Sequence, residues 1–315
     1  MSSLAFTVFG IHCILIVTGL SGNIFILIVH LLDWLKTREH NPCNIIINSI
    51  GTSNIILQGA VSFQEICFFI SPKLFSQVWV SFLIIGIMTS LTLSSLWCAT
   101  CLCFYYCVKI TNINRFMLYK LKAKLAKVVP WLIFFSVVLS WSSGMPAYWD
   151  LYFHFSLISG NKTGNVTMLM FYRNGSRCNC FFEMSIFLAS FAFAIIILTG
   201  GAIITSLCRH MSRMRQNNES WGQSRIQTHL SAVRTVTSLL VLYLVFFIIF
   251  TILSNPTSIT DDVTITVGFI VVACFPTLNS IILILGNRKP LNTVKKILGM
   301  KASMTNTNVS VITHD

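Results

Sequence analysis

Long apolar segments alternate with short polar loops along this chain. Seven segments of about 20 or more mainly apolar residues can be drawn, and a helix of that length crosses a hydrocarbon core of about 30 Å at 1.5 Å per residue. The pattern therefore predicts seven membrane-spanning helices. Their ranges are Leu4–Leu32, Asn44–Ile70, Val78–Val108, Val128–Trp149, Met184–Leu207, Leu230–Leu253 and Val263–Leu285.

The composition agrees with a membrane protein. Hydrophobic residues make up 55% of the chain and charged residues only 10%, whereas a soluble domain carries about 25% charge. The mean hydropathy is +0.77. We predict an all-α membrane protein with one seven-helix bundle over residues 1–298 and a cytoplasmic, disordered tail over residues 299–315.

Basic residues are distributed unevenly among the loops. Of the 22 Lys and Arg residues, four fall on one side of the predicted spans and the other 18 on the opposite side. Because cytoplasmic loops are enriched in Lys and Arg, this asymmetry predicts an N-terminus outside and a C-terminus in the cytoplasm. It also explains the net charge of +13 without a nucleic-acid partner. The four basic residues on the outer side are Lys73, Lys162, Arg173 and Arg177.

The longest predicted outer loop, 150–183, contains three Asn-x-Ser/Thr sequences, at Asn161, Asn165 and Asn174. Such acceptors are glycosylated only in the lumen, so they fit the predicted orientation. We expect a multi-pass glycoprotein of the plasma membrane. Cys178 and Cys180, at the end of the same loop, could pair with each other, pair with Cys67, or remain free.

Catalytic and metal-binding motifs are absent from the sequence. It contains no His-Glu-x-x-His, Gly-x-Ser-x-Gly or phosphate-loop pattern, and only nine acidic residues. We therefore expect neither an enzyme nor a bound metal or cofactor. A small channel or transporter remains an alternative, although these proteins usually carry more charge within the membrane.

Polar residues inside three of the apolar segments lie at a common depth. Asn23, Asn54, Asn279 and Ser280 fall about 10–15 Å from the cytoplasmic boundary at 1.5 Å per residue. Polar groups in hydrocarbon face the bundle interior, so the first, second and seventh helices could share one inner polar network. Its hydrogen bonds could simply hold helices together, or they could switch between two bundle arrangements.

Four motifs lie at spaced positions along the predicted bundle. The third segment ends in Trp97-Cys-Ala-Thr-Cys-Leu-Cys-Phe-Tyr and Lys109-Ile-Thr-Asn. The other motifs are Gly22-Asn-Ile-Phe-Ile with Asp33-Trp-Leu-Lys, His229-Leu-Ser-Ala-Val-Arg, and Pro276-Thr-Leu-Asn-Ser. Together they resemble the bitter taste receptors (type 2 taste receptors), which are G-protein-coupled receptors. The resemblance extends from about Ser21 to Leu298. Two positions depart from the family pattern, because Asn54 replaces an arginine and Asn279 replaces a histidine.

The resemblance implies a chemosensory receptor that binds small amphiphilic, bitter-type molecules in the outer half of the bundle. Position and resemblance together suggest contacts from the third, sixth and seventh segments. Glu65, near the outer end of the second segment, could attract cationic ligands or could simply be a solvated charge. The candidate ligand-binding residues are Met88, Thr89, Thr92, Phe246, Thr266, Phe269 and Glu65.

The inner loops are the expected surface for a heterotrimeric G protein, which the resemblance implies to be of the gustducin class. Their basic residues could instead serve topology and contact with anionic lipid. The candidate contacts are Lys109, Lys120, Lys122, Lys124, His229 and Arg234. The alternative function nearest to this one is a vomeronasal type-1-like receptor, which has a similar fold and different ligands.

Overall fold

The computed structural model describes residues 3–38, 41–70, 78–110, 124–143, 180–216, 223–253 and 262–299. Nearly all of these residues are helical, and the described ranges contain no strand. Six of the helices are α1 (Ser3–Thr37), α2 (Pro42–Ile70), α4 (Val78–Ile110), α6 (Cys180–Gln216), α7 (Gln223–Leu253) and α8 (Asp262–Gly286). The helix Lys124–Ser143 lies between α4 and α6 in sequence, and α9 (Arg288–Ile297) follows α8.

Helical structure is what apolar segments of this length must adopt in lipid, because every backbone N–H and C=O group then bonds within its own segment. Hydroxyl side chains follow the same rule. Thr18 donates to the carbonyl of Ile14 at 2.7 Å, and Ser90 donates to that of Gly86 at 2.8 Å. Such i−4 bonds allow Ser and Thr to lie in an apolar helix.

The helices extend beyond the apolar segments. α6 begins at Cys180 and reaches Gln216, whereas hydropathy marks only 184–207, and α1 continues to Thr37. Hydropathy reports the part of a helix that lies in lipid, so it misses polar turns that continue the same helix. Residues 144–149, the end of the fourth predicted segment, lie outside the described residues.

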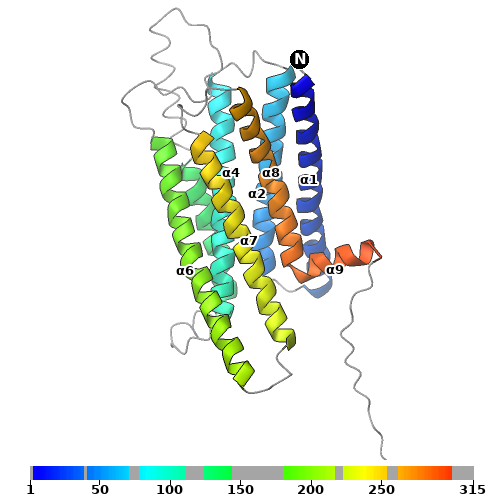
Figure 1. The fold of residues 1–315 in the computed structure, drawn as a ribbon, viewed down its shortest axis with the longest axis vertical. Coiled ribbons are helices and arrows are strands. Elements are labelled where there is room, and N and C mark those ends of the chain that lie inside the picture. The colour runs from blue at the N-terminus through cyan, green and yellow to red at the C-terminus, as the bar shows by residue number, and fades with distance from the viewer. Residues whose placement is uncertain are drawn as a thin grey trace, which may run out of the picture.

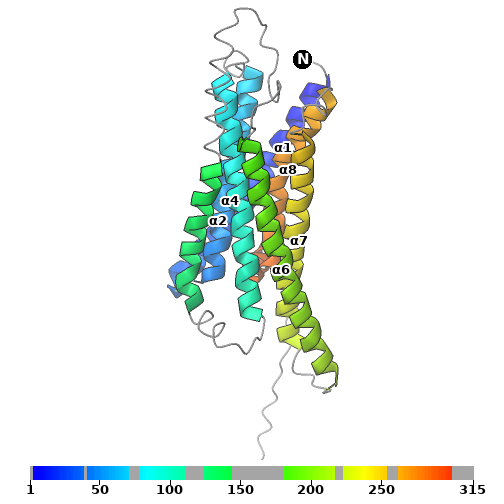
Figure 2. The same cartoon turned by 90° about the vertical axis from the view of Figure 1, so that its left-hand side faces the viewer.

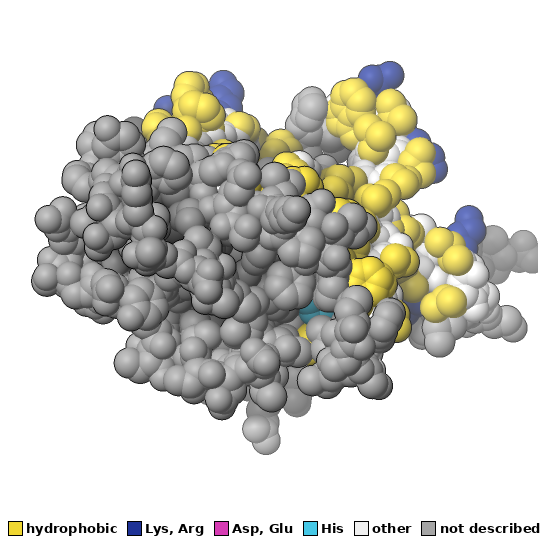
Figure 3. All heavy atoms as spheres, turned by 90° about the horizontal axis from the view of Figure 1, so that it is seen from above, with side chains coloured by type: hydrophobic (Ala, Val, Ile, Leu, Met, Phe, Trp, Pro, Cys, Tyr) yellow, Lys and Arg dark blue, Asp and Glu magenta, His cyan; other side chains and the backbone are white. Residues whose placement is uncertain are grey.

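Five described helices are long and apolar enough to span a membrane: Phe9–Thr37, Pro42–Gln64, Gly86–Ile110, Lys124–Ser143 and Glu183–Ser206. A sixth span is Ile270–Gly286 if it is taken together with the bent α9. α7 contributes a shorter apolar stretch, Val233–Ile249. Figure 3 shows hydrophobic side chains at the rim of the bundle in the view from above, with a few Lys and Arg side chains beyond them.

α4 occupies the middle of the bundle (Figures 1 and 2). It packs against α2, α6 and α7, while α8 packs against α1, α2 and α7. The apolar window of α4 is 78% buried, compared with 22% for Lys124–Ser143 at the periphery. A side chain on α4 therefore touches other helices rather than lipid on most of its faces.

α9 was not predicted from the sequence, because ten residues are too few to register as a membrane span. Its axis makes an angle of 92° with α8, and it runs sideways beside the end of α1 (Figure 1). Pro290 is its buried residue, whereas Lys295 and Lys296 are exposed. We call this end of the bundle the α9 end.

Candidate functional site

A chain of buried hydrogen bonds crosses the middle of the bundle. Ser95 of α4 donates to Asn54 Oδ1 of α2 at 3.2 Å, and Asn54 Nδ2 donates to Asn23 Oδ1 of α1 at 3.3 Å. Asn23 Nδ2 in turn donates to the carbonyl of Pro276 in α8 at 3.3 Å and to that of Gly19 at 2.8 Å. The side-chain amides of Asn54 and Asn23 thus connect α4, α2 and α1 to α8.

Tyr243 of α7 joins the other end of this chain. Its hydroxyl lies 2.8 Å from Ser95 Oγ, and Asn279 Nδ2 of α8 donates to it at 3.0 Å. Because Ser95 has one hydrogen and gives it to Asn54, the Tyr243 hydroxyl donates to Ser95. Asn279 Nδ2 also donates to Ser95 Oγ at 3.3 Å.

The bonds therefore form a directed chain that starts and ends on α8. It runs from Asn279 through Tyr243, Ser95, Asn54 and Asn23 to the carbonyl of Pro276. We call these five side chains and this carbonyl the relay. Each relay side chain is at most 2% exposed, and each is uncharged, so the relay pays no ion desolvation cost.

Ser280 does not join the relay. Its hydroxyl donates to the Thr277 carbonyl of its own helix at 2.8 Å and packs against α1, where a Cβ on Gly22 would lie 2.5 Å from Ser280 Oγ. Gly19 makes a similar close contact, since a Cβ there would lie 2.5 Å from Thr277 Oγ1 of α8 and 1.9 Å from Gln58 Nε2 of α2. Two glycines one turn apart let α1 approach α8 closely enough for Asn23 to reach Pro276.

An aromatic layer lies beside the relay on the side away from α9. The ring of Phe275 is 5.1 Å from that of Tyr243 and 4.5 Å from that of Phe246. Phe193 and Phe247 form a second pair at 5.4 Å. Rings at these separations pack favourably, so Phe275 contacts Tyr243 directly and links it to Phe246.

Four of the candidate ligand-binding residues have described side chains. Thr89 and Phe246 are buried, and Met88 and Thr92 are half-buried. The Thr92 hydroxyl donates to the Met88 carbonyl at 2.8 Å. The side chains of Glu65, Thr266 and Phe269 lie outside the described residues.

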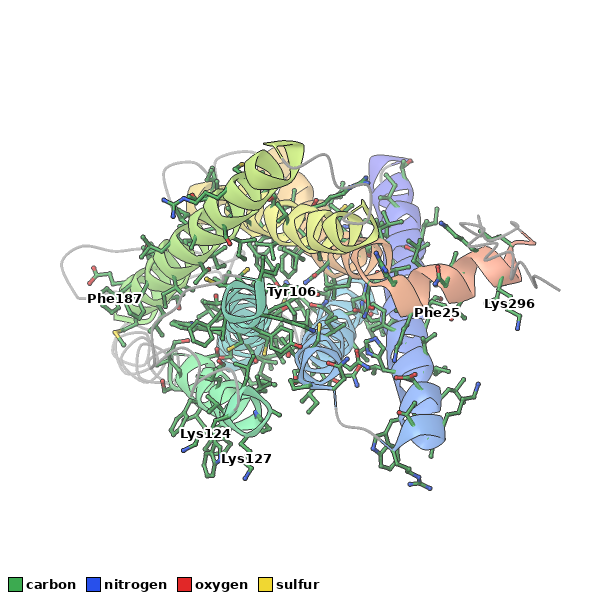
Figure 4. All side chains as sticks on the ribbon, turned by 90° about the horizontal axis from the view of Figure 1, so that it is seen from below. Phe25, Tyr106, Lys124, Lys127, Phe187 and Lys296 are labelled. Carbon is green, nitrogen blue, oxygen red and sulfur yellow. The ribbon has the colours of Figure 1, made fainter. Side chains whose placement is uncertain are left out.

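The candidate G-protein contacts that are described lie at the α9 end. Lys109, Lys124 and Arg234 are exposed, and Lys109 Nζ donates to the Tyr105 hydroxyl at 3.2 Å. Figure 4 shows Lys124 pointing away from the bundle, whereas Tyr106 points into it. Lys120, Lys122 and the His229 side chain lie outside the described residues.

The glycosylation acceptors Asn161, Asn165 and Asn174 also lie outside the described residues, as does Cys178. Cys67 is a buried free thiol in the structure. The arrangement in which Cys67 pairs with Cys178 or Cys180 is therefore not the one that the structure adopts. A disulfide between Cys178 and Cys180 is not tested by the described residues.

Comparison with known proteins now identifies the family. A sequence model of the taste receptor protein (TAS2R) family matches residues 1–302. The chain belongs to the taste receptor family. Human taste receptor type 2 member 9 is 26% identical over 282 residues, which cover 89% of each chain. Macaca mulatta taste receptor type 2 member 7 is 25% identical and covers 89% of this chain and 88% of its own.

Membership of this family makes the protein a seven-helix, multi-pass receptor of the plasma membrane with a bitter-taste function. It is a G-protein-coupled receptor and not an enzyme. The match also decides against the vomeronasal type-1-like and channel or transporter alternatives. The resemblance drawn from the four motifs is confirmed over the whole bundle.

Sequence reasoning missed Ser95 and Tyr243 as members of the relay. Both lie outside the family motifs quoted for their segments, and hydroxyl side chains are frequent in these helices and usually bond to their own backbone. A depth comparison extended to hydroxyls would have found candidates at this level. It would not have said which of them point toward Asn54 and Asn279.

Proposed function

We propose that the receptor binds a small amphiphilic molecule in the half of the bundle opposite α9, and that this half faces the outside of the cell. The orientation is supported by 18 of the 22 basic residues falling on the predicted inner side, which cytoplasmic loops favour. It places α9 at the cytoplasmic surface. The candidate glycosylation sites Asn161, Asn165 and Asn174 then face the lumen during synthesis.

Met88, Thr89, Thr92 and Phe246 support a ligand site in that half. The first three lie one to two helical turns before Ser95 in α4, and Phe246 lies one turn after Tyr243 in α7. A ligand there contacts the aromatic layer directly. Glu65, Thr266 and Phe269 would complete the site from α2 and α8. Apolar groups (Met88, Phe246 and Phe269) alternate there with threonines and one carboxylate, and this mixture favours an amphiphilic ligand.

The relay is the single observation that carries the proposed mechanism. A ligand acts only by favouring one of two arrangements, and the relay ties five helices through bonds that must exchange if α7 moves. Asn279 Oδ1 is buried and has no hydrogen-bond partner among the described residues, which costs about 1–3 kcal/mol. A second arrangement that pairs this oxygen would recover that cost, so the unpaired oxygen supports a relay with two states.

At the α9 end, the partner is a heterotrimeric G protein of the gustducin class. The exposed Lys109, Lys124 and Arg234 support this placement, because α4, α7 and the helix Lys124–Ser143 all present positive charge at the same end. Lys120, Lys122 and His229 lie close to them in sequence. An acidic or amphipathic segment of the G protein suits such a surface.

A calcium-mobilisation screen of bitter amphiphiles, in cells that express a chimeric G protein, tests the function directly. Tyr243→Phe then tests the mechanism, because it keeps the ring and removes one donor and one acceptor from the relay. We expect agonist potency or basal activity to change about tenfold, a typical allosteric coupling, at unchanged surface expression. Tyr106→Phe is the matched control, since its hydroxyl contacts Cys43 outside the relay.

Three outcomes would contradict separate parts of the proposal. A Tyr243→Phe receptor that signals like the wild type would exclude the relay as a switch. Ligand-evoked current in cells without G proteins would contradict the coupling. An unchanged electrophoretic mobility after glycosidase treatment, together with an unchanged mobility of the Asn161→Gln, Asn165→Gln, Asn174→Gln variant, would leave the outward-facing loop without support.

A further inference from the structure

A second polar cluster lies where α1, α2 and the turn between α8 and α9 meet. His30 of α1 uses both ring nitrogens: Nδ1 lies 2.6 Å from Asn48 Oδ1 of α2, and Nε2 lies 3.0 Å from Asn287 Nδ2. Asn287 is the residue that separates α8 from α9. His30 itself is only 2% exposed. We call His30, Asp33, Asn48, Asn287 and Lys289 the corner.

The two hydrogen bonds fix the protonation state of the ring. The amide oxygen of Asn48 accepts, so Nδ1 carries the hydrogen, and the amide nitrogen of Asn287 donates, so Nε2 is bare. The imidazole that fits the corner is therefore neutral. A second proton on Nε2 would place two hydrogen-bond donors, the ring N–H and the Asn287 amide N–H, against each other. The Asn287 side chain would then have to rotate by 180° or move away.

The two charged groups near the ring act in opposite directions, because the Asp33 carboxylate attracts a second proton and the Lys289 ammonium repels it. Asp33 lies one turn further along α1, and Lys289 belongs to α9; Lys289 Nζ and Asp33 Oδ2 are 2.6 Å apart. Since each partner satisfies the other, Asp33 is not a spare counter-ion for the imidazolium. α2 presents the neutral Asn48 to the ring. A buried positive charge without its own partner is unfavourable.

We propose that His30 is a proton-sensitive latch that holds α9 against α1 and α2. Neutral His30 closes the corner, and protonated His30 opens it, because the opened ring is hydrated and holds its proton more tightly. Acid therefore shifts the population toward a receptor whose α9 is released. The side of the membrane on which the proton acts rests on the proposed orientation, which places the corner in the cytoplasm.

Hydrogen–deuterium exchange of the purified full-length receptor in lipid nanodiscs tests the latch without agonist or G protein. The protection of the α9 amides is compared at about pH 7.5 and about pH 6, values on either side of the ordinary histidine pKa of about 6.5, after correction for intrinsic exchange. We expect protection in α9 to fall by about two- to fourfold at the lower pH, the most that one group with a pKa of about 6.5 in the open state can produce over this range. The helix Lys124–Ser143 should show no such change.

Variants separate the latch from other titrations. His30→Gln and His30→Asn keep a polar side chain that does not titrate, so the pH dependence of α9 protection should disappear in whichever of them folds. His12→Gln is the matched control, because His12 is also buried in α1 but lies 18 residues away. A wild-type α9 whose protection does not change with pH, or a change that persists in the His30 variants, would overturn the proposal.

Measurements in cells distinguish the latch from the proposed orientation. A resonance-energy-transfer pair, with one label on Asn292 of α9 and the other in the loop after α4, is read while the cytosolic and external pH are set independently. Cytosolic acid should change the signal and external acid should not. A response to external acid alone would contradict the orientation and retain the latch, whereas no response to either would overturn the latch.

Discussion

The relay and the corner both use amide side chains to join helices, but they differ in their exposure to water and in whether they contain a group that titrates near neutral pH. The relay contains no titratable group that changes charge near neutral pH, and all of its side chains are at most 2% exposed. The corner contains a histidine and an ion pair in which the Lys289 side chain is 49% exposed. The relay can therefore report only a mechanical change in helix packing, while the corner can also report the state of the solvent.

Replacing one amide side chain in the relay and one in the corner should give the largest difference in stability between the two variants. Asn54→Leu leaves Asn23 Oδ1 without its donor from α2, and leaves the Ser95–Tyr243 hydroxyl pair without an acceptor for one of its two hydrogens, at about 1–3 kcal/mol for each lost bond. Asn48→Leu removes one partner of His30, but the ring can move its proton to Nε2 and Asn287 can turn its amide, so one bond survives.

Thermal unfolding of the two purified receptors checks this expectation. The midpoint should fall several times further for Asn54→Leu than for Asn48→Leu, with surface expression reduced in the same order. Asn54→Ser, which restores a donor and an acceptor in less volume, should recover part of the loss. Equal effects at the two positions would mean that the relay bonds add no more than ordinary interhelical contacts of about 0.6 kcal/mol.

Gly286→Ala should have the next largest effect on stability. Gly286 is the last residue of α8 and lies next to Asn287 of the corner. A Cβ at Gly286 would lie 1.9 Å from Thr235 Oγ1 and 2.7 Å from Thr235 Cβ on α7. Thr235 is β-branched and cannot rotate away easily, so α7 and α8 must separate at the α9 end. Overpacking of this kind costs about 1–3 kcal/mol.

The readout for Gly286→Ala is agonist-independent signalling together with the unfolding midpoint. Separation of α7 from α8 beside the G-protein surface should raise basal activity while it lowers the midpoint. Gly201→Ala is the control, since nothing lies within 4 Å of a Cβ there. If the two variants behave alike, the close contact at Gly286 does not hold α7 in place.

Sequence alone located much of the relay, because depth along a helix follows directly from residue count. The rise of 1.5 Å per residue put Asn23, Asn54 and Asn279 at one level, and hydrogen bonds join them in the structure. Rotation about the helix axis is the missing coordinate. Ser280 lies at the right depth, yet its hydroxyl turns to its own backbone, and Ser95 and Tyr243 were overlooked although they point to the centre.

The corner could not have been found by the same reasoning. A single histidine inside an apolar segment usually signals only a buried polar contact, and the charges of α9 were interpreted as loop charges that set orientation. Only the 92° bend after Gly286 brings Asn287 and Lys289 back beside α1. Tertiary contact between residues 257 positions apart, such as His30 and Asn287, has no signature in local hydropathy.

The smallest expected effect comes from the ion pair of the corner. Asp33→Asn removes the carboxylate from Lys289 but leaves the His30 bonds intact. Exposed or partly exposed pairs contribute about 0.2–1 kcal/mol, and salt screens them. The unfolding midpoint should therefore fall slightly at low ionic strength and not at all in high salt, whereas the Asn54→Leu loss should be the same in both. A salt-independent loss for Asp33→Asn would show that this pair is shielded from solvent as the relay is, and the contrast between the two regions would then rest on His30 alone.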